Sequence, residues 1–257
     1  MLSCNIDTDL LKGNNSCCNV CLSTETKELN TMKNRLKDGF DYLSYGLWAF
    51  AVIGFELLLA YGIEYNLYGT DFKGFAAWQS ILHWVLTCIA WGIGAFLIMR
   101  DCKKKKGLDL IGNFKSSKIF DKSIQWWQWA LIVIGAVLCL ISTWIDWNGS
   151  KLLQEFNKRG PLLFPFQYLY YLFEVLLVLL IIIYGQTAFE KWFNNNKIPF
   201  GGILVALTWG IGHWYTKGSL GAGIYTAVGG FVFGAIYLLT NRNVKLSYIL
   251  LCIMFIL

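Results

Sequence analysis

Charged residues and proline are scarce in this chain, and hydrophobic residues are abundant. Only 15% of the 257 residues are charged and three are proline, whereas 56% are hydrophobic. Soluble domains are about 45–50% apolar, and they spread these residues in amphipathic stripes rather than in long blocks. The long blocks found here leave no room for a large soluble domain, so the composition indicates one domain embedded in a lipid bilayer.

The chain also lacks signals of processing and of repetition. Its first 40 residues contain no apolar run long enough for the core of a cleavable signal peptide. It has no internal repeat and no low-complexity tract. We therefore expect no cleaved leader.

The apolar residues are grouped in blocks of the length that crosses a membrane. A transmembrane helix needs about 20 apolar residues to span a hydrocarbon layer of about 30 Å. The chain contains six such blocks and a shorter one near residue 257. We therefore predict an all-α fold, a polytopic transmembrane helix bundle with six full spans and a short C-terminal seventh. The expected spans are residues 43–64, 75–99, 127–147, 164–184, 199–216, 218–240 and 246–257.

Glycine is concentrated in the last part of the chain. Ten of the 25 glycines lie between Gly201 and Gly234, and Gly230 and Gly234 have the spacing that lets transmembrane backbones approach closely. We therefore expect the fifth and sixth spans to form the tightly packed centre of the bundle.

Residues 1–40 are polar and are predicted to be a cytoplasmic, cysteine-containing tail. Residues 41–257 are predicted to be the transmembrane helical domain. Near the end of the tail, four apolar residues recur at helical spacing, which predicts an amphipathic helix that leads to the membrane or lies on its surface. These four residues are Leu29, Met32, Leu36 and Phe40.

Lysine and arginine are distributed unevenly between alternate loops. With the N-terminus in the cytoplasm, the inner segments hold 17 of these residues and the outer segments hold five. The positive-inside rule then predicts a multi-pass protein of the plasma (cytoplasmic) membrane with a cytoplasmic N-terminus. The run Lys103–Lys106 is interpreted as a topology determinant at an anionic leaflet, and no nucleic-acid partner is expected.

Four ionisable side chains fall within the predicted spans, where a charge costs at least about 2.5 kcal/mol. Glu56, His83 and Glu174 lie about ten residues from the outer ends of their spans, and His213 is nearer still. Imidazole with carboxylate suits zinc, so His83 and His213 are candidate metal ligands. The alternatives are paired polar groups that hold helices together, or a proton or substrate path. Glu64, at a span end, is expected to contact water.

The cysteines fall into two groups. One group lies in the predicted cytoplasmic tail, where a reducing compartment argues against disulfides, and is either a candidate zinc site or a site of acylation. The other group lies in the spans and is interpreted as small buried apolar residues. The tail group is Cys4, Cys17, Cys18 and Cys21, with Cys102 at the next cytoplasmic loop, and the span group is Cys88, Cys139 and Cys252.

The segment from Pro199 to Ile256 carries the most informative pattern. Trp209 precedes His213 by four residues in a glycine-containing span, and the sequence Gly218-Ser219-Leu220 follows. This arrangement resembles the second motif of the CAAX protease and bacteriocin-processing (CPBP, or Abi) family of intramembrane metalloprotease-like proteins, with tryptophan in place of the usual phenylalanine. The CPBP-like portion covers about residues 164–257.

The other two motifs of this family are not intact. The family has a glutamate pair followed by arginine where this chain has Gly185, Gln186 and Glu190. Its third motif falls on Cys252 and Ile256, in place of histidine and asparagine. In the family a glutamate activates water, while histidines and asparagine help to bind metal or the developing oxyanion. Gln186 cannot act as that general base, because an amide does not take up a proton near neutral pH.

The resemblance therefore implies a non-proteolytic relative that binds a hydrophobic peptide, a lipid or another membrane protein, as in bacteriocin self-immunity. One alternative is an active metalloprotease with a divergent site and zinc as its cofactor. Another is a transporter or channel that uses the intramembrane glutamates and histidines. The candidate catalytic residues are His213, Glu190 and Glu174, and the candidate binding residues are Glu56, His83, Trp209 and Gln186.

Overall fold

The protein, seen here in a computed structural model, is described for residues 15–119 and 121–257. Within these ranges it consists of helices and connecting loops, without a strand, as the sequence predicts. The side chains of the four tail cysteines lie outside the described part. The helices are α1 (Asn15–Leu57), η1 (Leu58–Glu64), α2 (Tyr65–Tyr68), η2 (Phe72–Gly74), α3 (Ala77–Lys106), α4 (Leu110–Ser116), α5 (Trp126–Asp146), α6 (Lys151–Phe193), α7 (Phe200–Val205), η3 (Ala206–Gly210), α8 (Ile211–Lys217), α9 (Leu220–Leu239) and α10 (Val244–Ile256).

Among the described residues, five helices are long and apolar enough to cross a membrane. They are α1 with its continuation to Tyr68, α3, α5, α6 and α9. This finding supports a multi-pass membrane protein in a lipid bilayer. The predicted fifth span corresponds to α7, η3 and α8, which follow one another without a loop, and the predicted seventh corresponds to α10, which has 13 residues. The total of six full spans stays a prediction.

Helix ends are set by local side-chain caps and by residues in left-handed conformation. The Asn243 carboxamide oxygen accepts a hydrogen bond from the Leu246 amide at 3.0 Å and starts α10. Gly107, with φ of 74°, ends α3 directly after its four lysines. These signals separate α3 from α4 and α9 from α10.

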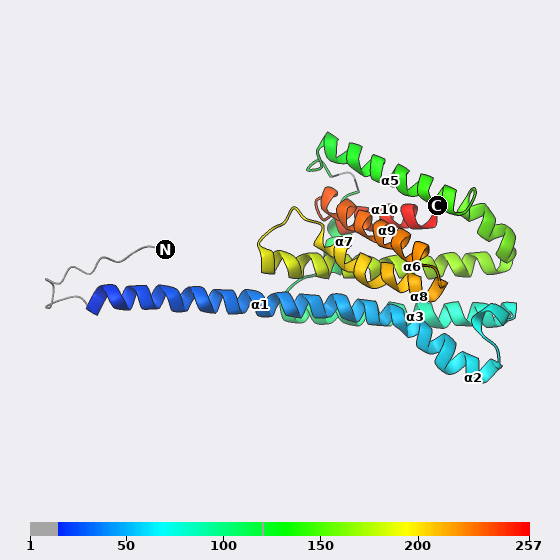
Figure 1. The fold of residues 1–257 in the computed structure, drawn as a ribbon, viewed down its shortest axis with the longest axis horizontal. Helices are drawn as coiled ribbons and strands as arrows, with labels where there is room; N and C mark the ends of the chain where they lie inside the picture. The colour runs from blue at the N-terminus through cyan, green and yellow to red at the C-terminus, as the bar shows by residue number, and fades with distance from the viewer. Residues whose placement is uncertain (1–14, 120) are drawn as a thin grey trace.

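Helix α1 continues across the predicted boundary at residue 40 without a break. Its N-terminal part projects beyond the other helices (Figure 1). The predicted amphipathic segment is therefore the extension of the first span, not a separate helix. It is held against the end of α6, where the Trp192 indole N–H donates to the Leu36 carbonyl at 3.1 Å. A Cβ at Gly39 would collide with the Trp192 ring, so this contact requires glycine.

Helix α6 is the centre of the bundle. Every residue from Leu177 to Gln186 is buried, and α1, α3, α7 and α10 pack against α6. A non-helical residue, Gly160 with φ of 74°, kinks α6 before Pro161. The prediction that spans five and six form the centre was therefore wrong, because glycine content reports close backbone approach and not depth of burial.

The glycines do bring α7, η3 and α9 together at backbone distance. A Cβ on Gly202 would lie 3.0 Å from the Gly234 Cα, and a Cβ on Gly230 would lie 2.7 Å from a Val205 methyl. The predicted close approach of spans five and six is therefore confirmed. This pairing positions Trp209, whose indole N–H reaches the Glu174 carboxylate on α6.

Candidate functional site

A cavity of about 710 Å³ lies between α1, α5, α6, α8, α9 and α10, at the end of the bundle where α5 ends and α6 begins. Its volume is in the range typical of small-molecule sites, about 300–1,000 Å³. The cavity extends to Leu138 on α5 and Val228 on α9, which are 61% and 60% exposed. Because these are lipid-facing positions in a membrane, the cavity has a side that adjoins the bilayer between α5 and α9.

Lys151 supplies a buried cation at the wall of this cavity. Its ammonium donates to the Phe255 carbonyl on α10 at 2.6 Å and lies 4.8 Å from the Tyr171 ring centre and 4.6 Å from the Phe255 ring centre. The side chain is buried, so the carbonyl and the two ring faces replace the water that would otherwise solvate it. Lys151 thus joins the start of α6 to the end of α10.

A cluster of hydrogen-bonded side chains links the two parts of α6 across the Gly160 kink. The Gln167 amide donates to the Glu155 carboxylate at 3.0 Å, and the Tyr171 hydroxyl donates to the same oxygen at 2.6 Å. The Arg159 guanidinium donates to the Gln167 carbonyl oxygen at 3.1 Å. These bonds fix the segment from Lys151 to Arg159 over the cavity.

Trp209 connects two of the candidate catalytic residues, Glu174 and His213. Its indole N–H donates to the buried Glu174 carboxylate at 2.8 Å. Its backbone carbonyl is 2.9 Å from His213 Nδ1, and the two rings are in edge contact with centres 4.6 Å apart. Glu174 and His213 both line the cavity. The geometry therefore brings one predicted carboxylate to the predicted histidine, with an indole between them.

His83 is bracketed by two carboxylates. Its Nδ1 is 2.6 Å from a Glu64 carboxylate oxygen and its Nε2 is 3.5 Å from a Glu56 oxygen. Glu56 accepts a further bond from the Tyr170 hydroxyl at 2.7 Å and lines the cavity. A row of ionisable groups thus runs from Glu64, which is buried, to the cavity wall. The expectation that Glu64 contacts water was wrong.

The residues around Trp209 and the residues around His83 each adjoin a π-helical turn. One turn, η1, directly follows the α1 segment that carries Glu56 and ends at Glu64; the other, η3, contains Trp209 and precedes His213. A π-turn inserts an extra residue and rotates the helix that follows, and such turns occur often at functional sites. Here the turn before α2 allows Glu56 and Glu64 to approach His83 from both sides.

Two predicted site residues lie elsewhere. Gln186 is buried near the opposite end of α6, where its amide donates to the Glu190 carboxylate at 2.7 Å and its carbonyl oxygen accepts the Gly201 amide at 2.9 Å. Glu190 is ion-paired with Arg242 at 2.6 Å. Neither residue lines the cavity. Their geometry is that of a structural joint between α6, α7 and the loop before α10.

The described residues do not form a zinc site. Between Thr26 and Leu257, leaving out residue 120, no group of three or more histidine, cysteine, aspartate and glutamate side chains is arranged to hold a metal ion. His83 and His213 have separate partners, Glu64 and Trp209 respectively. The zinc site predicted at the tail cysteines falls on side chains outside the described part and stays a prediction.

The sequence did not point to the cations of the cavity. Lys151, Arg159 and Lys217 all line it, but each lies between predicted spans, where a basic residue is ordinarily solvated. The one available signal is aromatic: Tyr170 and Tyr171 lie near the start of the predicted fourth span, and their hydroxyls donate to Glu56 and Glu155.

Comparison with known proteins identifies no relative. No family model matches the chain, and no curated protein and no solved structure matches it.

Proposed function

We propose that this chain is a multi-pass membrane protein that binds a hydrophobic peptide in the cavity between α5, α6, α8 and α9 and does not cleave it. The observation that supports the proposal is the lining of this cavity, which combines apolar and aromatic side chains with ionisable groups of both signs. A peptide presents the same mixture, since it has apolar side chains, amide groups and charged ends. The lipid-facing edge between Leu138 and Val228 would admit such a ligand from the bilayer.

The absence of cleavage is proposed from the placement of the carboxylates. Gln186 stands at the position of the family's general base and lies outside the cavity, and Glu190 is held by Arg242. Glu174 lines the cavity together with His213, and one of its oxygens accepts the hydrogen bond of the Trp209 indole. On the proposal, the CPBP resemblance reflects a shared fold that is used for binding, with self-immunity to a peptide as one role of this kind.

Lys217 is the residue that most directly tests the proposed peptide site. It lines the cavity, is exposed, and makes no ion pair with the residues that the structure describes. A peptide with a free carboxyl terminus is expected to raise the melting temperature of the purified protein more than its amidated form does, because ligand binding stabilises the folded state. One charge-assisted hydrogen bond corresponds to an affinity difference of about tenfold.

Lys217→Met is expected to abolish the difference between the two peptides, whereas Lys158→Met, at an exposed position outside the cavity, is expected to preserve it. Mass spectrometry of the peptide after incubation tests the proposal that the protein does not cleave it. Cleaved product from the wild type, lost in Glu174→Gln, would favour the divergent metalloprotease. An unchanged melting temperature with every hydrophobic peptide tested would refute the binding role.

A second candidate function, proton-coupled transport, is favoured by the row of Glu64, His83 and Glu56. Ionisable groups in contact inside a membrane often form proton paths, and this row ends at the cavity. In proteoliposomes that contain a pH-sensitive dye, transport would acidify the lumen when the peptide is added, and Glu56→Gln would abolish the change. A stable internal pH with a peptide that binds would exclude this function.

We further propose the orientation that the basic residues indicate, with Lys73 and Lys217 outside and Lys104 inside at the plasma membrane. In a variant without the four tail cysteines, Lys73→Cys is expected to react with a membrane-impermeant maleimide in intact cells. Lys104→Cys is expected to react only after the cells are opened. The reverse pattern would invert the topology.

A further inference from the structure

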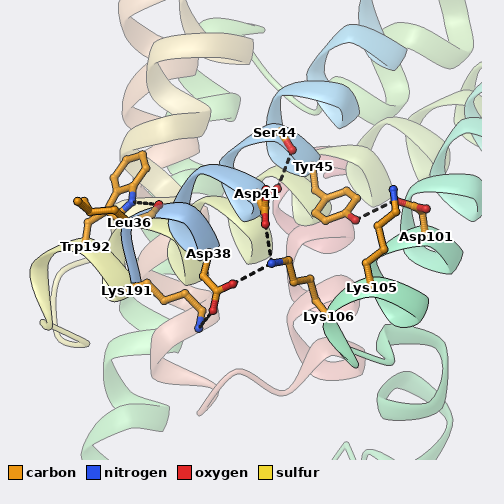
Figure 2. A network of polar contacts seen from close by, with 10 residues as sticks. All are labelled: Leu36, Asp38, Asp41, Ser44, Tyr45, Asp101, Lys105, Lys106, Lys191 and Trp192. Carbon is orange, nitrogen blue, oxygen red and sulfur yellow. Dashed lines mark hydrogen bonds and ion pairs between the residues drawn. The ribbon is translucent and has the colours of Figure 1, made fainter. Parts of the chain in front are cut away.

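A second hollow of the molecule lies between α1 and α3, at the end of the bundle opposite to the cavity. We call it the α1–α3 groove. It has a volume of about 800 Å³, and its lining includes Lys37, Asp41, Tyr45, Trp48, Leu97 and Lys105. Figure 2 shows its polar part, in which side chains from α1 and α3 point toward one another. The groove shares no residue with the cavity of the proposed peptide site.

The groove is charged at one end and apolar at the other. Along α1, Lys37 and Asp41 are followed one and two turns later by Tyr45 and Trp48, and α3 runs in the opposite direction, from Leu97 to Lys105. Trp48 is 63% exposed and Leu97 is 53% exposed. This order, from ions through tyrosine and tryptophan to aliphatic residues, matches the boundary between headgroups and hydrocarbon in a bilayer.

Charges of both signs alternate in the polar part. The Lys106 ammonium donates to Asp38 at 2.8 Å and to Asp41 at 2.6 Å, and Lys191 is 3.4 Å from the other Asp38 oxygen (Figure 2). Asp101 accepts from Lys105 at 2.9 Å and from the Tyr45 hydroxyl at 2.8 Å. Several of these groups keep unused hydrogen-bonding capacity, because an ammonium has three donors and a carboxylate has several acceptor sites.

Most of the neighbouring lysines are paired with carboxylates of the protein. Lys103 pairs with Asp109 at 2.6 Å, and this bond holds the pKa of the Asp109 carboxyl below its usual range. Three of the four lysines in the run Lys103–Lys106 therefore have acidic partners. Lys37 makes no ion pair within the described part of the chain. A purely anionic ligand would be repelled by the aspartates of the groove, whereas a zwitterion can pair with both the lysines and the aspartates.

We infer that the α1–α3 groove binds one phospholipid with a zwitterionic headgroup that carries a primary ammonium, such as phosphatidylethanolamine. The phosphate contacts Lys37 and Lys105, the ammonium donates to Asp41, and an acyl chain lies on Trp48 and Leu97. A primary ammonium has N–H donors for a carboxylate, whereas the quaternary ammonium of a choline headgroup has none. This recognition makes the groove selective between headgroups.

Native mass spectrometry of the full chain provides the test. The protein is reconstituted in nanodiscs of phosphatidylethanolamine, phosphatidylglycerol and phosphatidylcholine in equal amounts, and the lipid that remains bound after release is identified. Phosphatidylethanolamine is the expected bound lipid. Lys37→Met is expected to lower its occupancy by about tenfold, the effect of one charge-assisted hydrogen bond, and Trp48→Ala is expected to lower it as well.

Matched controls separate loss of the site from loss of fold. Lys33→Met, one turn earlier on α1, and Trp144→Ala, an exposed tryptophan on α5, change the same residue types outside the groove and are expected to leave occupancy unchanged. Equal retention of phosphatidylglycerol or phosphatidylcholine would overturn the proposed headgroup selectivity. Retention that is unaffected by Lys37→Met and Trp48→Ala, or no bound lipid in the wild type, would overturn the site itself.

Discussion

His83→Leu is expected to lower the free energy of unfolding by about 3–5 kcal/mol, the effect of removing one partner from a buried ion pair. The imidazole is fully buried and lies between the Glu64 and Glu56 carboxylates at 2.6 and 3.5 Å. Without it, Glu64 stays buried in the bundle with no partner for its charge. Unfolding in mixed micelles with increasing sodium dodecyl sulfate measures the change.

The control for this prediction is the other histidine of the chain. His213→Leu removes a ring whose Nδ1 faces a backbone carbonyl and leaves no carboxylate without its partner, so a smaller loss is expected. The double variant Glu64→Leu/His83→Leu is expected to be more stable than His83→Leu alone, because it removes the stranded carboxylate. A double variant whose losses simply add would show that Glu64 and His83 are not coupled.

Gly234→Val is expected to prevent the native packing of α9 against α7. A Cβ at this position would collide with the backbone of Gly202, and backbone cannot move aside as a flexible side chain can. Overpacking of a well-packed interior costs about 1–3 kcal/mol, and more where the obstacle is rigid. Size-exclusion chromatography and the melting temperature in detergent measure the loss of folded protein.

Gly229→Val is the matched control on the same helix, since nothing lies within 4 Å of a Cβ built at that position. It makes the same change in helix propensity and in volume without the collision. A small effect at Gly229 and a large one at Gly234 are expected. Equal effects would show that propensity, not close approach, makes glycine necessary in α9.

The sequence was a good guide to the helices and to the depth of their polar residues. The count of residues to the span ends predicts one level for Glu56, His83 and Glu174. His83 contacts Glu56, and Glu56 and Glu174 line one cavity. Depth along a helix follows from a fixed rise of about 1.5 Å per residue, so counting residues is enough. Apolar runs likewise predicted α3, α5 and α9 because the bilayer sets their length.

The sequence could not reveal what depends on rotation and on distant contacts. The π-turn η1 rotates Glu64 toward His83, and a polar residue at a span end gives no sign of that turn. The segment with Lys151 and Glu155 falls between two predicted spans. In the structure it is the first helical part of α6, before the Gly160 kink, and it is held over the cavity by partners such as Phe255, which lies about a hundred residues later. No local pattern records such a partner.

The pairing of Glu64 with His83 also bears on how the protein is made. Synthesis delivers α1 and η1 first, and Glu56 and Glu64 then have no partner, since His83 belongs to α3 and Tyr170 to α6. A lone carboxylate in the hydrocarbon layer is unfavourable by about 2.5–3.5 kcal/mol on insertion scales. Only 19 residues separate Glu64 from His83, so α3 supplies the compensating imidazole as soon as it emerges. The first two long helices are thus suited to enter the bilayer together, as a hairpin whose polar groups are already joined.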